Sequence, residues 1–370
     1  MERLVRDKID LLELQETLLQ LIEIPSESGA EEPLLQYLEK RLEKLGLPQM
    51  RQEAAPGRSN LVLNPLPEPA LLLDAHVDTV PVVIEGCPCL TRVEGRRIFG
   101  RGSADAKGGI ASLIAALELL KETGRDLSNW PVTVVFTVDE EQTAIGSAAA
   151  AAFFRPAEVI AVEPTGLAIC PAQAGSITVS IKLTGYPAHG SEMETGRNAI
   201  QQASELLADV RELPFLRAEH PLLGKNNFNI QKISGGTAEL VVPQFCELNL
   251  DFRVLPGQEI QDIKEELASF LSARGAAYEF LDLSPPFEVP ADLPVIKKLE
   301  REARAVLGRA PRLGGFRSWS DAENFAAAGA PAVVFGPGSL AVSHTPFEHV
   351  DLEEVRAAAH ILAALFRSYL

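Results

Sequence analysis

ALLLDA at 70–75, IASLIAALELLKETG at 110–124 and VTVVFTV at 132–138 are the stretches of sequence that decide the fold. The first and third are short, mostly apolar runs, typical of strands buried on both faces, whereas the second has the length and spacing of a helix. EVIAV at 158–162 adds another strand-like run. Strands that alternate with helices predict an α/β fold, in which helices cover both faces of a mostly parallel sheet.

A different order of elements begins near residue 175. The segments read as strand, helix, two strands, helix and strand: ITVSIKLTG, NAIQQASELLADVREL, FNIQKISGG, QFCELNLDFRV, EIQDIKEELASFLSARG and AAYEFLDLS. This βαββαβ order is the ferredoxin-like α+β pattern. We therefore predict an α/β domain in residues 1–174 and 286–370, interrupted by an inserted α+β domain in residues 175–285.

The N-terminal segment, residues 1–24, alternates charged and apolar residues at helical spacing. It lacks the uninterrupted apolar stretch of a signal peptide or membrane span, so we expect a cytoplasmic protein that does not bind membranes. The chain has four scattered cysteines, too few for a disulfide framework. Cys87-Pro-Cys89 resembles half of a metal site, but no second pair follows, and a loop with reduced thiols is the better interpretation.

The composition narrows the classes of molecule that this protein could bind. The chain has 370 residues, of which 46% are hydrophobic and 23% charged, as in an ordinary globular protein. Its formal net charge of -17 repels polyphosphate, so we expect no nucleic-acid partner. Small-molecule substrates remain open.

Side chains able to bind a metal ion follow four of the apolar runs. They are His76 after LLLDA, Glu141 after VTVVFTV, Glu163 after EVIAV and, beyond a short loop, His344 after AVVFGPG. Ligands of an open parallel sheet bind beyond the carboxyl ends of its strands, so these side chains are expected to converge. Asp105 in GRGSADAKGG is a fifth candidate, because the glycines around it let the backbone approach the site.

Imidazole and carboxylate groups are ligands of zinc, cobalt and manganese. Two histidines and three carboxylates fit two divalent ions better than one. We expect Asp105 to bridge the ions, with His76 and Glu163 on one and Glu141 and His344 on the other. Such a pair lowers the pKa of a shared water and stabilises an oxyanion, which suits the hydrolysis of an amide.

Two further acidic residues adjoin these ligands. Asp78 lies two positions after His76, on the same side of an extended segment, and we expect it to accept the N–H of the imidazole nitrogen that does not bind metal. Glu140 precedes Glu141 without being needed as a ligand, so we assign it the role of general base and acid.

Each of these motifs also has an ordinary explanation. An HxD sequence or a Glu-Glu pair at a strand end is often surface charge. The glycine-rich stretch at 100–109 resembles a phosphate loop, but it lacks the Lys-Ser/Thr ending and does not match GxGxxG. The joint occurrence of five ligand-type residues, with a spare carboxylate beside one of them, favours a metal site.

Together HVDTV, GRGSADAKGGIA, DEE, VEPT and GPG...SHTPFEHV resemble the zinc exopeptidase and deacylase family of acetylornithine deacetylase, succinyl-diaminopimelate desuccinylase, aminoacylase and glutamate carboxypeptidase. The motifs span nearly the whole chain in the family's order. The resemblance implies the same five metal ligands, the same roles for Asp78 and Glu140, and a cis peptide bond after Asp105. It also implies that the α/β domain is catalytic and that the inserted domain is a lid, which often mediates homodimer formation.

The resemblance assigns two residues of the predicted lid. His189 in LTGYPAHGS matches a histidine that polarises the scissile carbonyl, although a lone histidine in such a turn is more often structural. Arg253 in DFRVLPG matches an arginine that binds the substrate carboxylate, the alternative being an exposed edge residue. Leu240 stands where the family usually has an asparagine that contacts substrate, and leucine cannot replace its hydrogen bonds.

We therefore expect a cytoplasmic dinuclear zinc hydrolase that cleaves the amide bond of an N-acyl amino acid, with cobalt or manganese as alternative metals. A di- or tripeptidase or a carboxypeptidase of the same mechanism is the alternative. A non-catalytic binding relative is disfavoured, since all five ligands and Glu140 are present. Glu348, four residues after His344, either orients that histidine or is surface charge.

Overall fold

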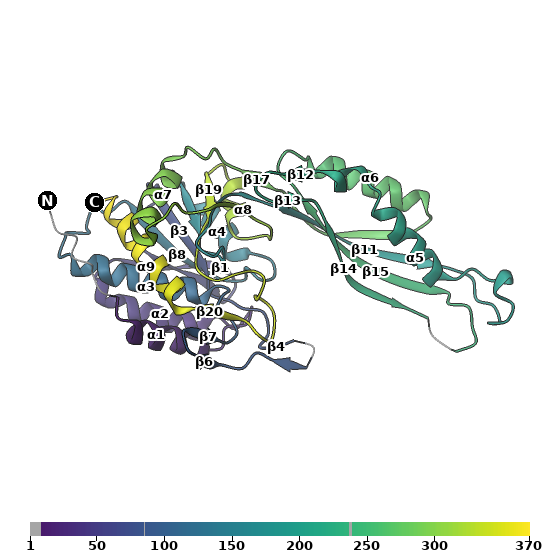
Figure 1. Cartoon of the computed structure of the whole chain (residues 1–370), viewed down its shortest axis with the longest axis horizontal. Coiled ribbons are helices and arrows are strands. Elements are labelled where there is room, and N and C mark those ends of the chain that lie inside the picture. The colour runs from purple at the N-terminus through teal and green to yellow at the C-terminus, as the bar shows by residue number, and fades with distance from the viewer. Residues whose placement is uncertain (1–8, 85, 237–238) are drawn as a thin grey trace. The chain divides into compact units, whose positions relative to one another are not determined.

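The computed structural model describes residues 9–84, 86–236 and 239–370, which form two compact units (Figure 1). Unit 1 contains the chain up to Pro171, Val289–Gly314 and Ser320–Leu370; unit 2 contains Ala172–Glu288 and Gly315–Trp319. The chain therefore leaves unit 1 once for a long excursion and once for a short one. The short excursion was not expected from the sequence. It begins in β18 (Leu313–Phe316), which pairs with β10 (Ile169–Gln173), the strand that leads into unit 2.

Within the described residues, nine strands form the large sheet, in the order β1-β2-β8-β3-β9-β19-β10-β17 with β18 beside β10. The remaining bounds are β1 Gln49–Ala55, β2 Arg58–Leu63, β3 Leu71–His76, β8 Val132–Thr137, β9 Val159–Ala161, β19 Ala332–Val334 and β17 Phe287–Glu288. The four central strands β8, β3, β9 and β19 are mutually parallel, and the flanking pairs are antiparallel. The carboxyl ends of β8, β3, β9 and β19 therefore lie at one edge of the sheet.

Helices cover both faces of this sheet, which confirms the predicted α/β architecture (Figure 1). Along β3, Leu71 and Leu73 belong to the core beneath one layer of helices, while Leu72 between them faces the other side, as the two-residue period of a strand requires. The first layer consists of α1 Leu11–Glu23, α2 Glu32–Leu42, α3 Lys107–Glu122, α7 Pro294–Leu307 and α9 Leu352–Arg367. The second consists of α4 Ile145–Phe153 and α8 Ala322–Ala327.

Unit 2 has an antiparallel four-stranded sheet in the order β14-β15-β11-β16. Its elements are β11 Gly175–Thr184, α5 Ala199–Val210, β14 Phe228–Gly235, β15 Phe245–Val254, α6 Ile260–Ala273 and β16 Ala277–Ser284. Alternate residues of the inner strands, such as Ile177 and Leu250, are buried against α5 and α6. The βαββαβ order expected from the sequence is confirmed.

Short elements complete both units. They are β4 Val83–Ile84, β5 Cys87–Pro88, β6 Arg92–Glu94, β7 Arg97–Phe99, β12 Glu219–His220, β13 Gly224–Lys225, β20 His349–Asp351 and the 3-10 turns Glu43–Leu45, Met193–Thr195 and Pro214–Arg217. Gly46 closes the first of these turns in the left-handed region, with φ 72°.

None of the helices in the described parts of the chain has the length and apolarity needed to cross a bilayer.

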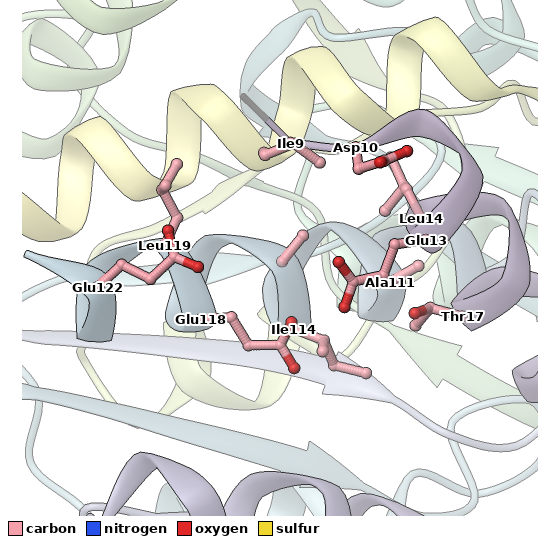
Figure 2. A pocket seen from close by; sticks show the side chains of 11 residues that line it. Ile9, Asp10, Glu13, Leu14, Thr17, Ala111, Ile114, Glu118, Leu119 and Glu122 are labelled. Atoms are coloured by element: carbon pink, nitrogen blue, oxygen red, sulfur yellow. The ribbon is translucent and has the colours of Figure 1, made fainter. Parts of the chain in front are cut away.

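A small cavity of about 60 Å³ lies between α1 and α3 (Figure 2). Its rim carries acidic side chains, among them Glu13 and Glu118. Arg41 holds both, with its Nη2 3.6 Å from Glu13 Oε1 and its Nε 3.0 Å from Glu118 Oε1. Because these charges are paired and none of the predicted ligands lines the space, the cavity belongs to helix packing.

Asn60 in β2 links the elements on either side of the turn that carries Glu140 and Glu141. Its buried amide donates to Gly146 O at 2.8 Å, and its Oδ1 accepts the N–H of Val138 at 3.2 Å. One side chain thus forms hydrogen bonds with backbone groups at the end of β8 and at the start of α4.

We predict that Asn60→Ala lowers the free energy of unfolding of unit 1 by about 1–3 kcal/mol, since it leaves the N–H of Val138 without its partner and a buried group left unpaired costs roughly that much. Denaturant unfolding followed by tryptophan fluorescence measures the change, because Trp130 is buried in this unit. The control is Asn129→Ala, which removes an exposed amide and should shift stability by less than about 0.5 kcal/mol. Equal shifts in the two variants would contradict this role of Asn60.

Candidate metal centre

The five predicted metal ligands all lie in unit 1, at or beyond the ends of its elements. His76 is the last residue of β3, Glu141 follows β8, Glu163 follows β9, His344 lies in the loop after β19, and Asp105 precedes α3. The parallel pairing of β8, β3, β9 and β19 brings the first four to one edge of the sheet.

The ligand atoms form two groups that share Asp105. In the first, His76 Nε2 lies 3.1 Å from Asp105 Oδ1 and 3.9 Å from Glu163 Oε1. In the second, His344 Nε2 lies 3.0 Å from Glu141 Oε1 and 3.6 Å from Asp105 Oδ2. Within each group the atoms lie within 4.8 Å of one another. The two oxygens of Asp105 thus face different histidines, which is the geometry of a bridging carboxylate.

The electrostatics of the cluster suit divalent cations. Burial raises the pKa of Glu163 well above the usual range and raises that of Glu141, and the Asp105 carboxylate adds to both effects. Burial also acts to raise the pKa of Asp105, but the hydrogen bond and charge of His76, together with His344 and Ser343, lower it overall. Several buried carboxylates repel one another, and they are stable together when cations neutralise their negative charges. Imidazole nitrogen with carboxylate oxygen is a donor set of zinc, cobalt and manganese, so these residues fit a metal pair.

Asp78 is more central than the sequence suggested. Its carboxylate accepts the backbone N–H groups of Glu140 and Glu141, each at 3.0 Å, and the hydroxyl of Ser28 at 2.7 Å. The nearest partner of His76 Nδ1 is the backbone oxygen of Asp78 at 3.1 Å, while the carboxylate oxygen lies at 3.6 Å. Asp78 therefore orients His76 through its main chain and fixes the Glu140–Glu141 turn through its side chain.

Glu140 lies beside the first ligand group. It is 9% exposed, and one of its oxygens lies within 4.8 Å of ligand atoms of His76 and Glu141. Burial raises its pKa well above the ordinary value; the His76 charge opposes this shift, and the Glu163 carboxylate adds to it. A carboxyl group in such surroundings is suited to accepting and returning a proton.

Asp139 and Arg58 support the same turn and were not singled out from the sequence. Asp139 adopts a left-handed conformation with φ 68°, which aspartate tolerates better than most residues. Arg58 Nη1 pairs with its Oδ1 at 2.8 Å, and the other Arg58 Nη pairs with Glu31. The only sequence signal was the position of Asp139 directly before the Glu-Glu pair, since both ion pairs are contacts distant in sequence.

His189 and Arg253 lie in unit 2. His189 is exposed, and its Nδ1 lies 2.9 Å from the Ser191 hydroxyl. Arg253 is paired with Asp251, so part of its guanidinium is already engaged. Leu240, at the position where the resemblance led us to expect asparagine, is 77% exposed and has φ 61°, while its carbonyl accepts the N–H of Gly190 at 2.6 Å.

Comparison with known proteins gives a consistent result. The model of peptidase family M20/M25/M40 matches residues 72–368. A protein of Edwardsiella ictaluri described as acetylornithine deacetylase is 30% identical, over 81% of this chain and 80% of its own.

Solved structures with lower sequence identity to this chain share its fold. A tripeptidase from Staphylococcus aureus superposes with a TM-score of 0.78 at 23% identity, covering 98% of this chain and 99% of that one. A Bacillus subtilis protein described as a dinuclear metal-binding peptidase of family M20 has a TM-score of 0.68 at 16% identity, over 96% and 97% of the two chains. Since the family model covers most of the sequence and includes all five clustered side chains, the chain belongs to peptidase family M20/M25/M40 and is a metallohydrolase.

Proposed function

We propose that this protein hydrolyses the amide bond of an N-acyl amino acid, in the manner of an acetylornithine or succinyl-diaminopimelate deacylase, and that it holds two zinc ions. The observation that carries this proposal is the division of the Asp105 oxygens between His76 and His344, at 3.1 and 3.6 Å. Curated relatives at 29–30% identity that are described as acetylornithine deacetylases support the substrate class.

His76, Glu163 and Asp105 would hold one ion, and Glu141, His344 and Asp105 the other. When bound, such a pair lowers the pKa of a shared water and stabilises the oxyanion that forms at the scissile carbonyl. Glu140 then takes a proton from the attacking water and delivers it to the nitrogen of the leaving amine. Asp78 keeps Glu140 in place by accepting its backbone N–H.

We assign substrate-binding roles to two residues of unit 2, as the family resemblance implies. His189, which has an exposed ring, is assigned by the resemblance to the hydrogen bond that polarises the scissile carbonyl. Arg253 binds the substrate carboxylate with guanidinium N–H groups beyond those that pair with Asp251. In this scheme unit 2 is the lid, and unit 1 is the catalytic domain.

We also propose that the lid forms a homodimer. Strand β14 is an edge of the unit 2 sheet, and its Ile230 and Ile233 are 37% and 55% exposed. An exposed apolar edge strand is a template for pairing with another chain. Sedimentation of the full chain at micromolar concentration reports the mass: a dimer agrees with this assignment, and a monomer contradicts it.

The second candidate is a tripeptidase or carboxypeptidase that uses the same ligands and base. It is favoured by the structural likeness to the Staphylococcus aureus tripeptidase and to a metallo-carboxypeptidase of Sulfolobus solfataricus, with TM-scores of 0.78 each. Their sequence identities to this chain are 23% and 19%, which is evidence for a shared fold but not for a shared substrate. We therefore rank deacylation first.

The neighbours Glu140 and Glu141 provide a matched test of mechanism. We predict that Glu140→Gln keeps both ions but lowers kcat about 10²–10⁴-fold, the usual contribution of a general base. Glu141→Gln should instead weaken one ion, because it removes a ligand. Metal content after dialysis, measured beside kcat, separates the two effects. Wild-type turnover in Glu140→Gln would exclude Glu140 as the base.

A substrate panel tests the reaction itself. We predict that the zinc-loaded protein releases the amine from N-acetylornithine or N-succinyl-diaminopimelate with a kcat/KM at least tenfold above that for any di- or tripeptide. Amine release is followed by a ninhydrin or coupled assay, with protein stripped by a chelator as the blank. Cleavage of peptides alone would establish the second candidate in place of the first.

A further inference from the structure

Glu348 is buried completely, with 0% of its surface exposed, which excludes the surface-charge interpretation. It lies four residues after His344 and directly before β20. A buried carboxylate requires hydrogen-bond partners or a cation, because its desolvation is otherwise costly. The identity of those partners indicates what it does.

The partners of Glu348 belong to the segment that carries Asp105. Its Oε1 accepts the backbone N–H of Ala104 at 3.1 Å and that of Asp105 at 3.2 Å. Its Oε2 pairs with the guanidinium of Arg101, which is 4% exposed and also donates through Nε to Pro81 O at 3.0 Å. The carboxylate therefore fixes the main chain at Asp105 rather than the ring of His344.

The main chain reinforces this connection. Gly100 donates its N–H to the carbonyl of Glu348 at 3.1 Å, and His349 pairs with Phe99 where β20 meets β7. Two segments distant in sequence, residues 97–105 and 344–351, are thus joined side by side. The first ends at Asp105 and the second begins at His344.

We propose that Arg101 and Glu348 are positioning residues that set the separation between Asp105 and His344, and with it the geometry of the ion site formed by Asp105, Glu141 and His344. Neither residue is expected to touch metal or substrate. The proposal rests on the two-metal part of the proposed function. The side chain of His344 is 48% exposed, so its position depends on the backbone segment that carries it.

The charge of Glu348 is essential to this arrangement. As a carboxylate it accepts two N–H groups on one oxygen and balances the buried guanidinium with the other. An amide at this position keeps the shape but turns an NH₂ group toward Arg101, which leaves the buried cation without its counter-charge. The expected consequence is a displaced Asp105 segment rather than an unfolded protein.

The test is a metal titration of the full chain without substrate. Metal-free wild type and Glu348→Gln are titrated with Co²⁺, using calorimetry for the two dissociation constants and visible absorption for the ligand geometry. We expect one site to weaken 10–100-fold with an altered Co²⁺ spectrum, as for other residues that orient ligands. The other site should weaken by a clearly smaller factor, because Asp105 is shared by both sites whereas only one of them also depends on His344. Two unchanged constants, or equal losses at both sites, would overturn the proposal.

Glu158→Gln is the matched control. Glu158 is also a buried glutamate that accepts a backbone N–H, from Val295 at 2.8 Å, but it precedes β9, at the end opposite Glu163. Its variant should bind both ions as wild type does. Weaker metal binding in this control would show that loss of protein stability lowers the affinity for metal, and it would contradict the positioning role.

Arg101→Lys gives an independent variant in case Glu348→Gln does not fold. Lysine keeps the charge but cannot pair with Glu348 and donate to Pro81 O through a rigid fork, so the same site should weaken, by a smaller factor. Unchanged binding in Arg101→Lys would refute the role of the pair. Because substrate is absent, failure of amide hydrolysis would refute the proposed function without altering this result.

Discussion

The structure depends on one electrostatic constraint: several carboxylates are held together, away from water, at one edge of a parallel sheet. Asp105 stands at the centre, with one oxygen toward His76 and the other toward His344. Like charges repel strongly in a medium of low dielectric constant, so such a cluster is stable when cations lie between its members. The proposed chemistry uses the same cations, so the stability of the site and its function have a common origin.

The fold meets this constraint through contacts between segments that are distant in sequence. Parallel pairing of the central strands brings their carboxyl ends together, and Asp78 then ties the strand that carries His76 to the turn that carries Glu140. Asn60 and Arg58 support that turn from the other side. Each of these contacts ends on the residues that follow β8, at 138–140. The site is therefore built on rigid elements, as precise placement of ligands requires.

Much of this could be predicted from the sequence, because it depends on local patterns. Apolar runs located the strands, and four of the five ligand-type residues follow such runs, as with His76 after LLLDA and Glu163 after EVIAV. The ferredoxin-like order of unit 2 followed from the periodicity of six segments in the same way. The sequence therefore predicts the five side chains that cluster in the structure.

Other features could not be predicted, because they are tertiary contacts without a local signal. Nothing near Gly315–Trp319 indicated that it joins unit 2, and the spacing of His76 and Asp78 did not show that the carboxylate bonds to the Glu140–Glu141 turn. Glu348 was left between two interpretations. Its burial excludes surface charge, and its direct partners are Arg101 and the main chain at Asp105. Its partners lie more than 240 positions away in the sequence.

The most direct test of the account is anomalous diffraction from crystals grown with zinc, recorded on both sides of the zinc absorption edge. The account predicts two peaks about 3.5–4 Å apart, one beside His76 and Glu163 and one beside Glu141 and His344, with Asp105 between them. A single peak, or zinc bound away from Asp105, would contradict it.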